Sequence, residues 1–315
     1  MIFISIVDVS RPITSASCNE AILSIVRTYP FCRTELLTNT VFQRPIRTLV
    51  IGNGPRKVLY SASHHANEWI TSLLLLKFIE DLASSVAAAD DNESQNSPLS
   101  TLNSQLLQQV TLYAVPMVDP DGVDLVVGAI PEDSVQFSLA QSLSRNYPSI
   151  PFPDGWKANL LGVDLNLQYP AGWLQAREIK FTQGFTRPGP RDFVGRAPLD
   201  QVETRSLAGY TEAVNPDLVI ALHTQGEEIY WQFEDIFVPG ARELGEEFAR
   251  VSGYTLADTP YNSAFAGYKD WFIQRFRRPG YTIEAGKGEN PLPIEDFPAI
   301  YKSVQPILLR GLQPL

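Results

Sequence analysis

The sequence predicts an α/β fold: a single domain, residues 1–315, with a mixed, mostly parallel twisted sheet flanked by helices on both faces. Short apolar segments typical of buried strands alternate along the chain with segments in which apolar residues recur at helical spacing. No internal repeat interrupts this alternation. With 44% hydrophobic residues the chain can build one large core, and α/β enzymes of this length often form one domain.

The first part of the chain is expected to hold two helices and three strands. A helical pattern ends near Tyr29, and apolar residues at helical spacing predict a second helix over 68–81. Strands are predicted at 47–52, 58–60 and 110–118. The turn Gly52–Pro55 joins the first two strands and predicts a β-hairpin at the sheet edge, while a turn at 119–122 closes the third strand.

Two regions lack a periodic pattern. Residues 87–104 are polar and are expected to form a solvated loop. Residues 146–198 are rich in proline, glycine and aromatic residues. Because so long an irregular stretch in a compact enzyme is usually functional, we expect residues 146–198 to form part of an active-site surface.

The second half of the chain returns to alternating helices and strands. Helices are predicted at 200–214, 241–251, 268–276 and 294–312. Strands are predicted at 218–222, 228–233 and 280–284. The first of these strands runs directly into His223, and the last one ends with Glu284. Polar groups are therefore expected at the ends of two buried strands.

Charge and composition exclude several classes of partner. The net charge is −10 and no basic run exceeds Arg277–Arg278, so nucleic acid and anionic membranes are not expected as partners. No apolar run approaches the roughly 20 residues of a membrane span. The apolar start lacks a basic region before it, so no secretory signal is expected and the cytoplasm is predicted. Cys18 and Cys32 are expected to be free thiols. The oligomeric state stays open.

Two of the three histidines, His64 and His65, stand where a predicted strand passes into a helix. Open α/β sheets place their ligands at such points. His65 and Glu68 are three residues apart, a spacing that can bring an imidazole and a carboxylate to one metal ion. The alternative is that His64, His65 and Glu68 only cap the helix and pair with neighbouring groups.

Three side chains share a position in the predicted sheet. His65, His223 and Glu284 each lie at or just beyond the end of an apolar strand, and such ends converge in a parallel sheet. Two imidazoles and one carboxylate, with a position left for water, form the ligand set of catalytic zinc. Glu284 is then a candidate to accept a proton from that water; the alternative is a buried glutamate paired with a lysine or arginine.

The motifs that carry these residues resemble the zinc carboxypeptidase family over most of the chain. The resemblance rests on His65-Ala-Asn-Glu-Trp69, Gly162-Val-Asp-Leu-Asn166, His223, Lys269-Asp-Trp271 and Glu284, in the order and rough spacing of that family. The amino-acid sequence around these motifs is similar to that of the bacterial γ-D-glutamyl-L-diamino acid endopeptidases, which act on murein peptides. The segments that carry this finer similarity are 64–70, 156–159, 162–173 and 184–186.

The resemblance implies a role for each motif residue. His65, Glu68 and His223 would bind one zinc ion, and Glu284 would be the general base. Asp164 would hold the imidazole ring of His65 in place, with an ordinary turn aspartate as the alternative.

Substrate contacts are implied for a second group of residues. Asn166 would bind a substrate carboxylate or amide. Tyr261 lies near the position of the family's mobile substrate-binding tyrosine, although its spacing from the Asp-Trp pair differs slightly and an ordinary loop tyrosine is the alternative. Lys269 precedes that pair, where the family's specificity pocket is lined, and would bind an acidic group; the alternative is a solvated helix lysine.

Two departures from the family pattern bear on the reaction. Exopeptidases of the family follow the asparagine with an arginine that binds the substrate's terminal carboxylate, but this chain has Leu167. The family also keeps an arginine after the tryptophan segment to polarise the scissile carbonyl, whereas Trp156 is followed here by Lys157. Lys157 or an arginine from elsewhere would take that role. The first departure argues against a simple carboxypeptidase, and the second gives some weight to a non-catalytic binding module.

The predicted function is zinc-dependent hydrolysis of the amide bond between γ-D-glutamate and a diamino acid, lysine or diaminopimelate, in murein stem peptides. Two alternatives stay within enzymes: a metallocarboxypeptidase that removes C-terminal residues, and an aspartoacylase-like deacylase of N-acyl amino acids. A non-catalytic binding module with the same fold is the third alternative.

Overall fold

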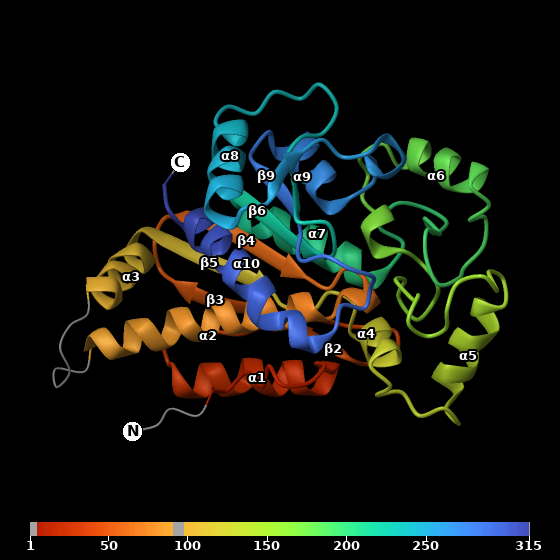
Figure 1. Cartoon of the computed structure of the whole chain (residues 1–315), viewed down its shortest axis with the longest axis horizontal. Coiled ribbons are helices and arrows are strands. Elements are labelled where there is room, and N and C mark those ends of the chain that lie inside the picture. Colours follow the sequence, from red (N-terminus) through yellow and green to blue (C-terminus); the bar gives the residue numbers. More distant parts are fainter. Residues whose placement is uncertain (1–4, 91–97, 315) are drawn as a thin grey trace.

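A seven-stranded mixed sheet forms the centre of the computed structural model, which describes residues 5–90 and 98–314 (Figure 1). Its strand order is β3-β5-β4-β6-β9-β7-β8. The strands are β3 (Leu49–Gly52), β4 (Arg56–Ala62), β5 (Val110–Val115), β6 (Leu218–His223), β7 (Glu228–Tyr230), β8 (Thr255–Ala257) and β9 (Gly280–Glu284). The four central strands β5, β4, β6 and β9 run parallel, whereas β3 and β7 are antiparallel to their sheet neighbours β5 and β9. The predicted mostly parallel sheet is confirmed.

Helices cover both faces of this sheet, as predicted. Side chains alternate between the faces of a strand, so Tyr60 of β4 packs in one core cluster and Leu59 in another. The Tyr60 face lies against α1 (Ser15–Thr28), α2 (Ile70–Asp90), α8 (Ala241–Ser252) and α10 (Phe297–Leu312). The Leu59 face lies against α7 (Val202–Val214) and α9 (Tyr268–Phe276). Burial on both faces explains why the central strands are apolar throughout.

The predicted hairpin is wrong. Residues 49–52 and 56–62 are both strands, but β3 and β4 lie on opposite sides of β5, and each pairs with β5 rather than with the other. β3 does stand at the sheet edge. A second, two-stranded sheet that was not predicted is formed by β1 (Leu36–Asn39) and β2 (Pro45–Arg47).

Two predicted loops are largely helical. α2 continues to Asp90, and α3 (Pro98–Gln109) begins soon after it, so the expected polar loop over 87–104 is wrong for most of its length; 91–97 lie outside the described residues. The expected turn at 119–122 is the start of α4 (Pro120–Val126), because the Asp119 side chain accepts a hydrogen bond from the N–H of Gly122 at 2.9 Å. Asp-Pro is a helix start as well as a turn signal.

Residues 145–201, between α5 (Val135–Ser144) and α7, lie beyond the carboxyl ends of the parallel strands, at the right of Figure 1. They are irregular, as predicted for 146–198, except for the short helix η2 (Leu165–Leu167) and α6 (Trp173–Thr182). Three further short helices occur: η1 (Ala66–Glu68), η3 (Tyr261–Ser263) and η4 (Ile294–Asp296). The irregular segment therefore covers the edge of the sheet where ligands bind in open α/β folds.

The structure bears on the predictions about the two cysteines and about membrane spans. Cys18 and Cys32 are buried and unpaired, as expected for free thiols. Within the described ranges, no helix combines the length and apolar character that crossing a bilayer requires.

A paired glycine substitution tests how closely α10 packs on the sheet. A Cβ atom at Gly311 would lie 2.3 Å from the hydroxyl of buried Tyr60, which donates a hydrogen bond to Leu308 O at 2.9 Å. We expect Gly311→Ala to destabilise the fold by about 1–3 kcal/mol because of this overlap. Gly209→Ala in α7 is the control, because its Cβ would meet nothing within 4 Å, and it should gain about 0.5–1 kcal/mol from helix propensity. Urea unfolding measures both, and equal effects would contradict the packing.

Candidate active site

The loop from Ser63 to Glu68 carries the first two site residues from the end of β4 into α2. Ser63 takes a left-handed backbone conformation, with φ of 49°, which is uncommon for a residue with a side chain. Buried hydroxyls of α2 hold it there: Ser63 N donates to Thr71 Oγ1 at 2.9 Å, and the Ser63 and Ser72 hydroxyls are 2.7 Å apart. Ala66 N donates to Lys157 O at 3.0 Å, which fixes the far side of the loop.

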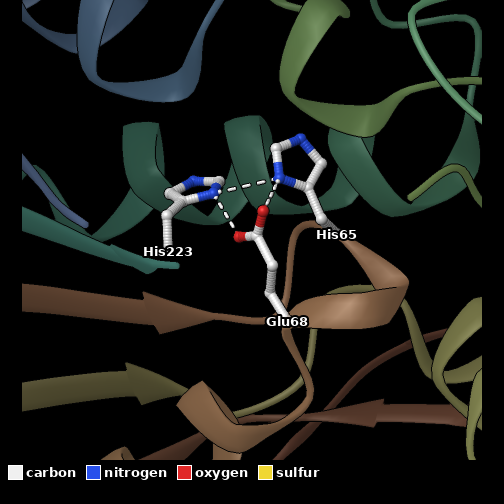
Figure 2. A group of neighbouring side chains, drawn as sticks. All are labelled: His65, Glu68 and His223. Atoms are coloured by element: carbon white, nitrogen blue, oxygen red, sulfur yellow. Dashed lines mark hydrogen bonds and ion pairs between the residues drawn. The ribbon is translucent and has the colours of Figure 1, made fainter. Parts of the chain in front are cut away.

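His65, Glu68 and His223 converge at the centre of the site (Figure 2). The carboxylate of Glu68 lies between the two rings: Oε1 is 2.8 Å from Nδ1 of His65 and Oε2 is 2.8 Å from Nδ1 of His223. The two Nδ1 atoms are themselves 3.1 Å apart. All three side chains are buried, and their ligand atoms lie within 4.8 Å of one another.

This cluster fits a divalent metal ion. Two imidazole nitrogens that face each other and one carboxylate bring several lone pairs to a single point, which a cation satisfies better than a proton does. The donor set is the one that catalytic zinc uses when a further position is left for water. Burial alone would lower the pKa of His65, but the carboxylates of Glu68 and Asp164 raise that pKa to about 9. The cluster therefore attracts positive charge.

Asp164 lies directly behind His65. Its Oδ1 is 3.1 Å from Nε2 of His65 and also accepts a hydrogen bond from Asn166 N at 3.1 Å. Although burial opposes it, the positive charges of His65 and Lys157 hold the pKa of Asp164 below its usual range. The carboxylate is thus ionised, and it can fix which nitrogen of His65 carries the proton.

The histidine next to the cluster is not part of it. His64 is fully buried, its Nε2 is 3.2 Å from the hydroxyl of Tyr169, and its ring stacks on that of His223 at 5.6 Å. Burial and the neighbouring His223 lower the pKa of His64 well below its ordinary value. For His64, the structure therefore favours the alternative, in which the side chain only pairs with neighbouring groups.

Glu284 stands beside the cluster at the end of β9. The parallel pairing of β6 and β9 sets Glu284 directly opposite His223. Among the described residues its carboxylate has neither a hydrogen bond nor an ion pair, so the alternative of a glutamate paired with lysine or arginine is wrong. Burial and the negative charge of Glu68 raise the pKa of Glu284 to about 8.

Two of the predicted substrate residues reach the same site. The Lys157 ammonium is 3.6 Å from Oε1 of Glu68, and although burial lowers its pKa, Glu68 and Asp164 raise it overall, so Lys157 is charged. Asn166 accepts a hydrogen bond from Tyr268 N at 3.0 Å and lines a cavity of about 170 Å³ together with Glu284.

Of the other two predicted substrate residues, Lys269 is buried and Tyr261 is exposed. Lys269 also lines the cavity of about 170 Å³, but it is only 4% exposed, so the alternative of a solvated lysine is wrong. Its ammonium lies 2.5 Å from Oδ1 of Asp270 and donates to Gln232 O at 2.5 Å. Tyr261 is 70% exposed, packs its ring edge-on against Phe265, and is not among the residues that line this cavity.

A second, larger cavity of about 790 Å³ joins the first one. The two cavities share five lining residues and therefore meet beside the metal cluster: Lys157, Arg191, Tyr230, Ser263 and Glu284. Arg191 was not identified from the sequence, which only allowed an arginine from elsewhere. It lies in the irregular segment 146–198, where no periodic pattern or motif marks a single residue.

Known proteins resemble this chain over most of its length. Residues 19–305 match the model of the zinc carboxypeptidase family. The chain is 43% identical over 286 residues to γ-D-glutamyl-L-diamino acid endopeptidase 1 of Lysinibacillus sphaericus, an alignment that covers 90% of this chain and 68% of the relative.

Solved structures share the fold at low sequence identity. Carboxypeptidase A from Helicoverpa armigera superposes with a TM-score of 0.70 at 16% identity, covering 96% of this chain and 74% of the other. Murein-tripeptide amidase MpaA from Escherichia coli O157 gives a TM-score of 0.52 at 18% identity, covering 88% and 91%. The family match over most of the chain and the 43% identical relative agree. The chain belongs to the zinc carboxypeptidase family of metallopeptidases.

Proposed function

We propose that this metallopeptidase hydrolyses the amide bond between γ-D-glutamate and a diamino acid in cell-wall stem peptides, with one zinc ion at the His65–Glu68–His223 cluster. The observation that carries the proposed substrate is the 43% identity, over 90% of this chain, to a protein named for that bond. Two features of the site support it. Leu167 stands where the exopeptidases of the family have a carboxylate-binding arginine, and the site opens into two cavities rather than one closed pocket.

In this proposal His65, Glu68 and His223 hold the zinc ion. Zinc bound there would lower the pKa of a water molecule and polarise the scissile carbonyl. Asp164 accepts the Nε2 proton of His65, which would leave the Nδ1 lone pair of that ring free for the ion. The buried hydroxyls of Thr71 and Ser72 hold Ser63, at the start of the loop that carries His65 and Glu68.

Glu284 takes the proton of the attacking water and returns it to the leaving amine. Its carboxylate has no competing partner among the described residues, and its raised pKa gives it the basicity that a proton acceptor needs. A cation held by Glu68 would offset the negative charge that is one cause of that raised pKa, and so would lower the pKa of Glu284. Lys157, charged and next to Glu68, stabilises the negative charge that develops on the carbonyl oxygen.

The remaining site residues would contact the substrate. Asn166 contacts the diamino acid side of the peptide, and Lys269 lies in the same cavity, neutralised by Asp270. Tyr261 is placed to contact substrate only if its loop moves inward. The cytoplasm is the proposed compartment, since buried unpaired thiols such as Cys18 and Cys32 are the normal state there.

Substituting the base tests its role apart from metal binding. We expect Glu284→Gln to lower kcat by about 10²–10⁴-fold or more while bound zinc stays stoichiometric, because the amide cannot accept the proton. The substrate is L-Ala-γ-D-Glu-diaminopimelate-D-Ala, and mass spectrometry identifies the products with and without a chelator. Chelator-sensitive release of L-Ala-D-Glu is expected.

Other products of the same assay would contradict the proposal. Release of D-Ala alone indicates a carboxypeptidase. Cleavage of an N-acyl amino acid, with the peptide left intact, indicates a deacylase. Full activity of Glu284→Gln would remove Glu284 from the base role.

Replacing Asp164 separates a metal-supporting role from an ordinary turn aspartate. Asp164→Asn keeps an oxygen for Asn166 N but loses the charge that supports His65, so zinc affinity should fall by about 10- to 100-fold. Competition with a chromophoric chelator measures it. The control is Asp235→Asn, at an exposed loop residue. Equal affinities in the two variants would mean that Asp164 only caps η2.

Zinc binding should depend on pH through His65. With a pKa of about 9 in the metal-free protein, His65 carries a proton at neutral pH that zinc must displace. His65 alone is therefore expected to weaken zinc affinity by roughly tenfold for each unit that the pH falls below 9, and at least about one proton should be released per zinc at pH 7.5. Calorimetry in buffers of different ionisation enthalpy counts the protons. No proton release would show that His65 is already neutral.

A further inference from the structure

Arg191 lies where the two cavities of the site meet. It lines both of them together with Lys157 and Glu284, and its side chain is 41% exposed. We propose that Arg191 binds the free α-carboxylate of the γ-linked D-glutamyl residue and so selects peptides that carry it. This inference rests on the proposed function.

The position of Arg191 is fixed relative to the reaction centre. The carbonyl oxygen of the preceding residue, Pro190, accepts hydrogen bonds from the N–H groups of Lys157 at 2.7 Å and Ala158 at 2.9 Å. The residue after it, Asp192, donates its N–H to Asp164 at 3.3 Å. The backbone on both sides of Arg191 is therefore attached to residues that face the metal cluster.

Neighbouring groups orient the guanidinium of Arg191 through its Nε atom and leave its two terminal nitrogens available. Nε of Arg191 donates to Oδ2 of Asp192 at 2.6 Å, and the other oxygen of that carboxylate is 2.6 Å from the ammonium of Lys180. No hydrogen bond is formed by the two terminal guanidinium nitrogens within the described part of the chain. A guanidinium fork held by its Nε is arranged to bind a carboxylate through two parallel hydrogen bonds.

The charges around the cavities leave Arg191 as the available cation. Lys269 is neutralised by Asp270 at 2.5 Å, and Lys157 faces Glu68 at the cluster. Lys180 and Arg191 share the Asp192 carboxylate, so one carboxylate is in direct contact with two cations. An anionic substrate group could therefore pair with Arg191.

The chemistry of a γ-linked glutamate supplies such an anion at the required place. The γ-carboxyl forms the scissile amide, so the α-carboxylate stays free. Four carbon–carbon bonds of about 1.5 Å separate the two carboxyl carbons, which therefore lie at most roughly 5 Å apart. A carboxylate that close to the scissile carbonyl lies within reach of the residues around Glu284, and Arg191 lines both cavities together with Glu284.

A pair of substrates tests this inference. One is L-Ala-γ-D-Glu-diaminopimelate, and the other is the same peptide with the D-glutamyl α-carboxylate converted to a carboxamide. For the zinc-loaded wild-type protein, kcat/KM should be roughly 10- to 100-fold higher for the acid, the range expected for one charge-assisted hydrogen-bonded pair.

Substitutions then assign that preference to a residue. Arg191→Met should lower kcat/KM for the acid by roughly the same factor while leaving the amide within about threefold, and Arg191→Lys should fall between. The carboxamide substrate is an internal test of folding. The control Arg196→Met removes an arginine of the same segment whose side chain is 91% exposed, and it should change neither substrate.

Binding gives a readout that does not depend on turnover. The zinc-loaded Glu284→Gln protein should bind the uncleaved acid peptide more tightly than the amide in calorimetry, and adding Arg191→Met should abolish the difference. Equal losses on both substrates, or no loss on the acid, would overturn the inference and make Arg191 a structural residue. If wild-type protein cleaves neither peptide, the proposed function itself fails, and the inference with it.

Discussion

The metal cluster depends on the register between the parallel strands β4, β6 and β9. β4 pairs with β6 so that Ala62 lies opposite Leu222, and β6 pairs with β9 so that His223 lies opposite Glu284. A slip of one residue in either pair would turn the site residue to the opposite face of the sheet. Apolar side chains fill both faces of these strands, so such a slip would also expose the core. The packing of the core thus determines where the residues of the candidate site lie.

Charge is the second constraint, because the site buries several ionised groups together. Glu68, Asp164 and Lys157 are buried or nearly so, and each would be costly alone. Each faces an opposite charge or a hydrogen-bond donor: Glu68 meets two imidazoles, and Asp164 meets His65. The exception is Glu284, which has no partner in the described chain. An unpaired carboxylate with a raised pKa beside such a cluster is a candidate functional group.

The sequence predicts those site residues whose positions depend only on local patterns. Strand ends and short motifs identified His65, Glu68, His223 and Glu284 because burial of a strand and the residue after it are both local. The hairpin failed because the turn at Gly52–Pro55 says nothing about β5, which arrives after α2 and α3 and inserts between the two strands. Residues 98–104 were predicted as part of a loop because of their polar composition, but they form a helix that packs on α2. Arg191 had no local signal, since its place depends on hydrogen bonds to a segment about 30 residues earlier.

The positions of the cations link the family pattern to the proposed substrate. An exopeptidase binds a terminal carboxylate on the leaving side of the scissile bond, and here the corresponding position is the apolar, buried Leu167. The cation with a free hydrogen-bonding edge is instead Arg191, at the junction that both cavities share. Under the proposed function, a carboxylate bound by Arg191 belongs to the D-glutamyl residue on the acyl side of the bond, which leaves the far end of the diamino acid unrestricted. The same fold and metal cluster would then cut within a peptide, because the charge that positions the substrate would belong to the acyl side and not to a terminal carboxylate.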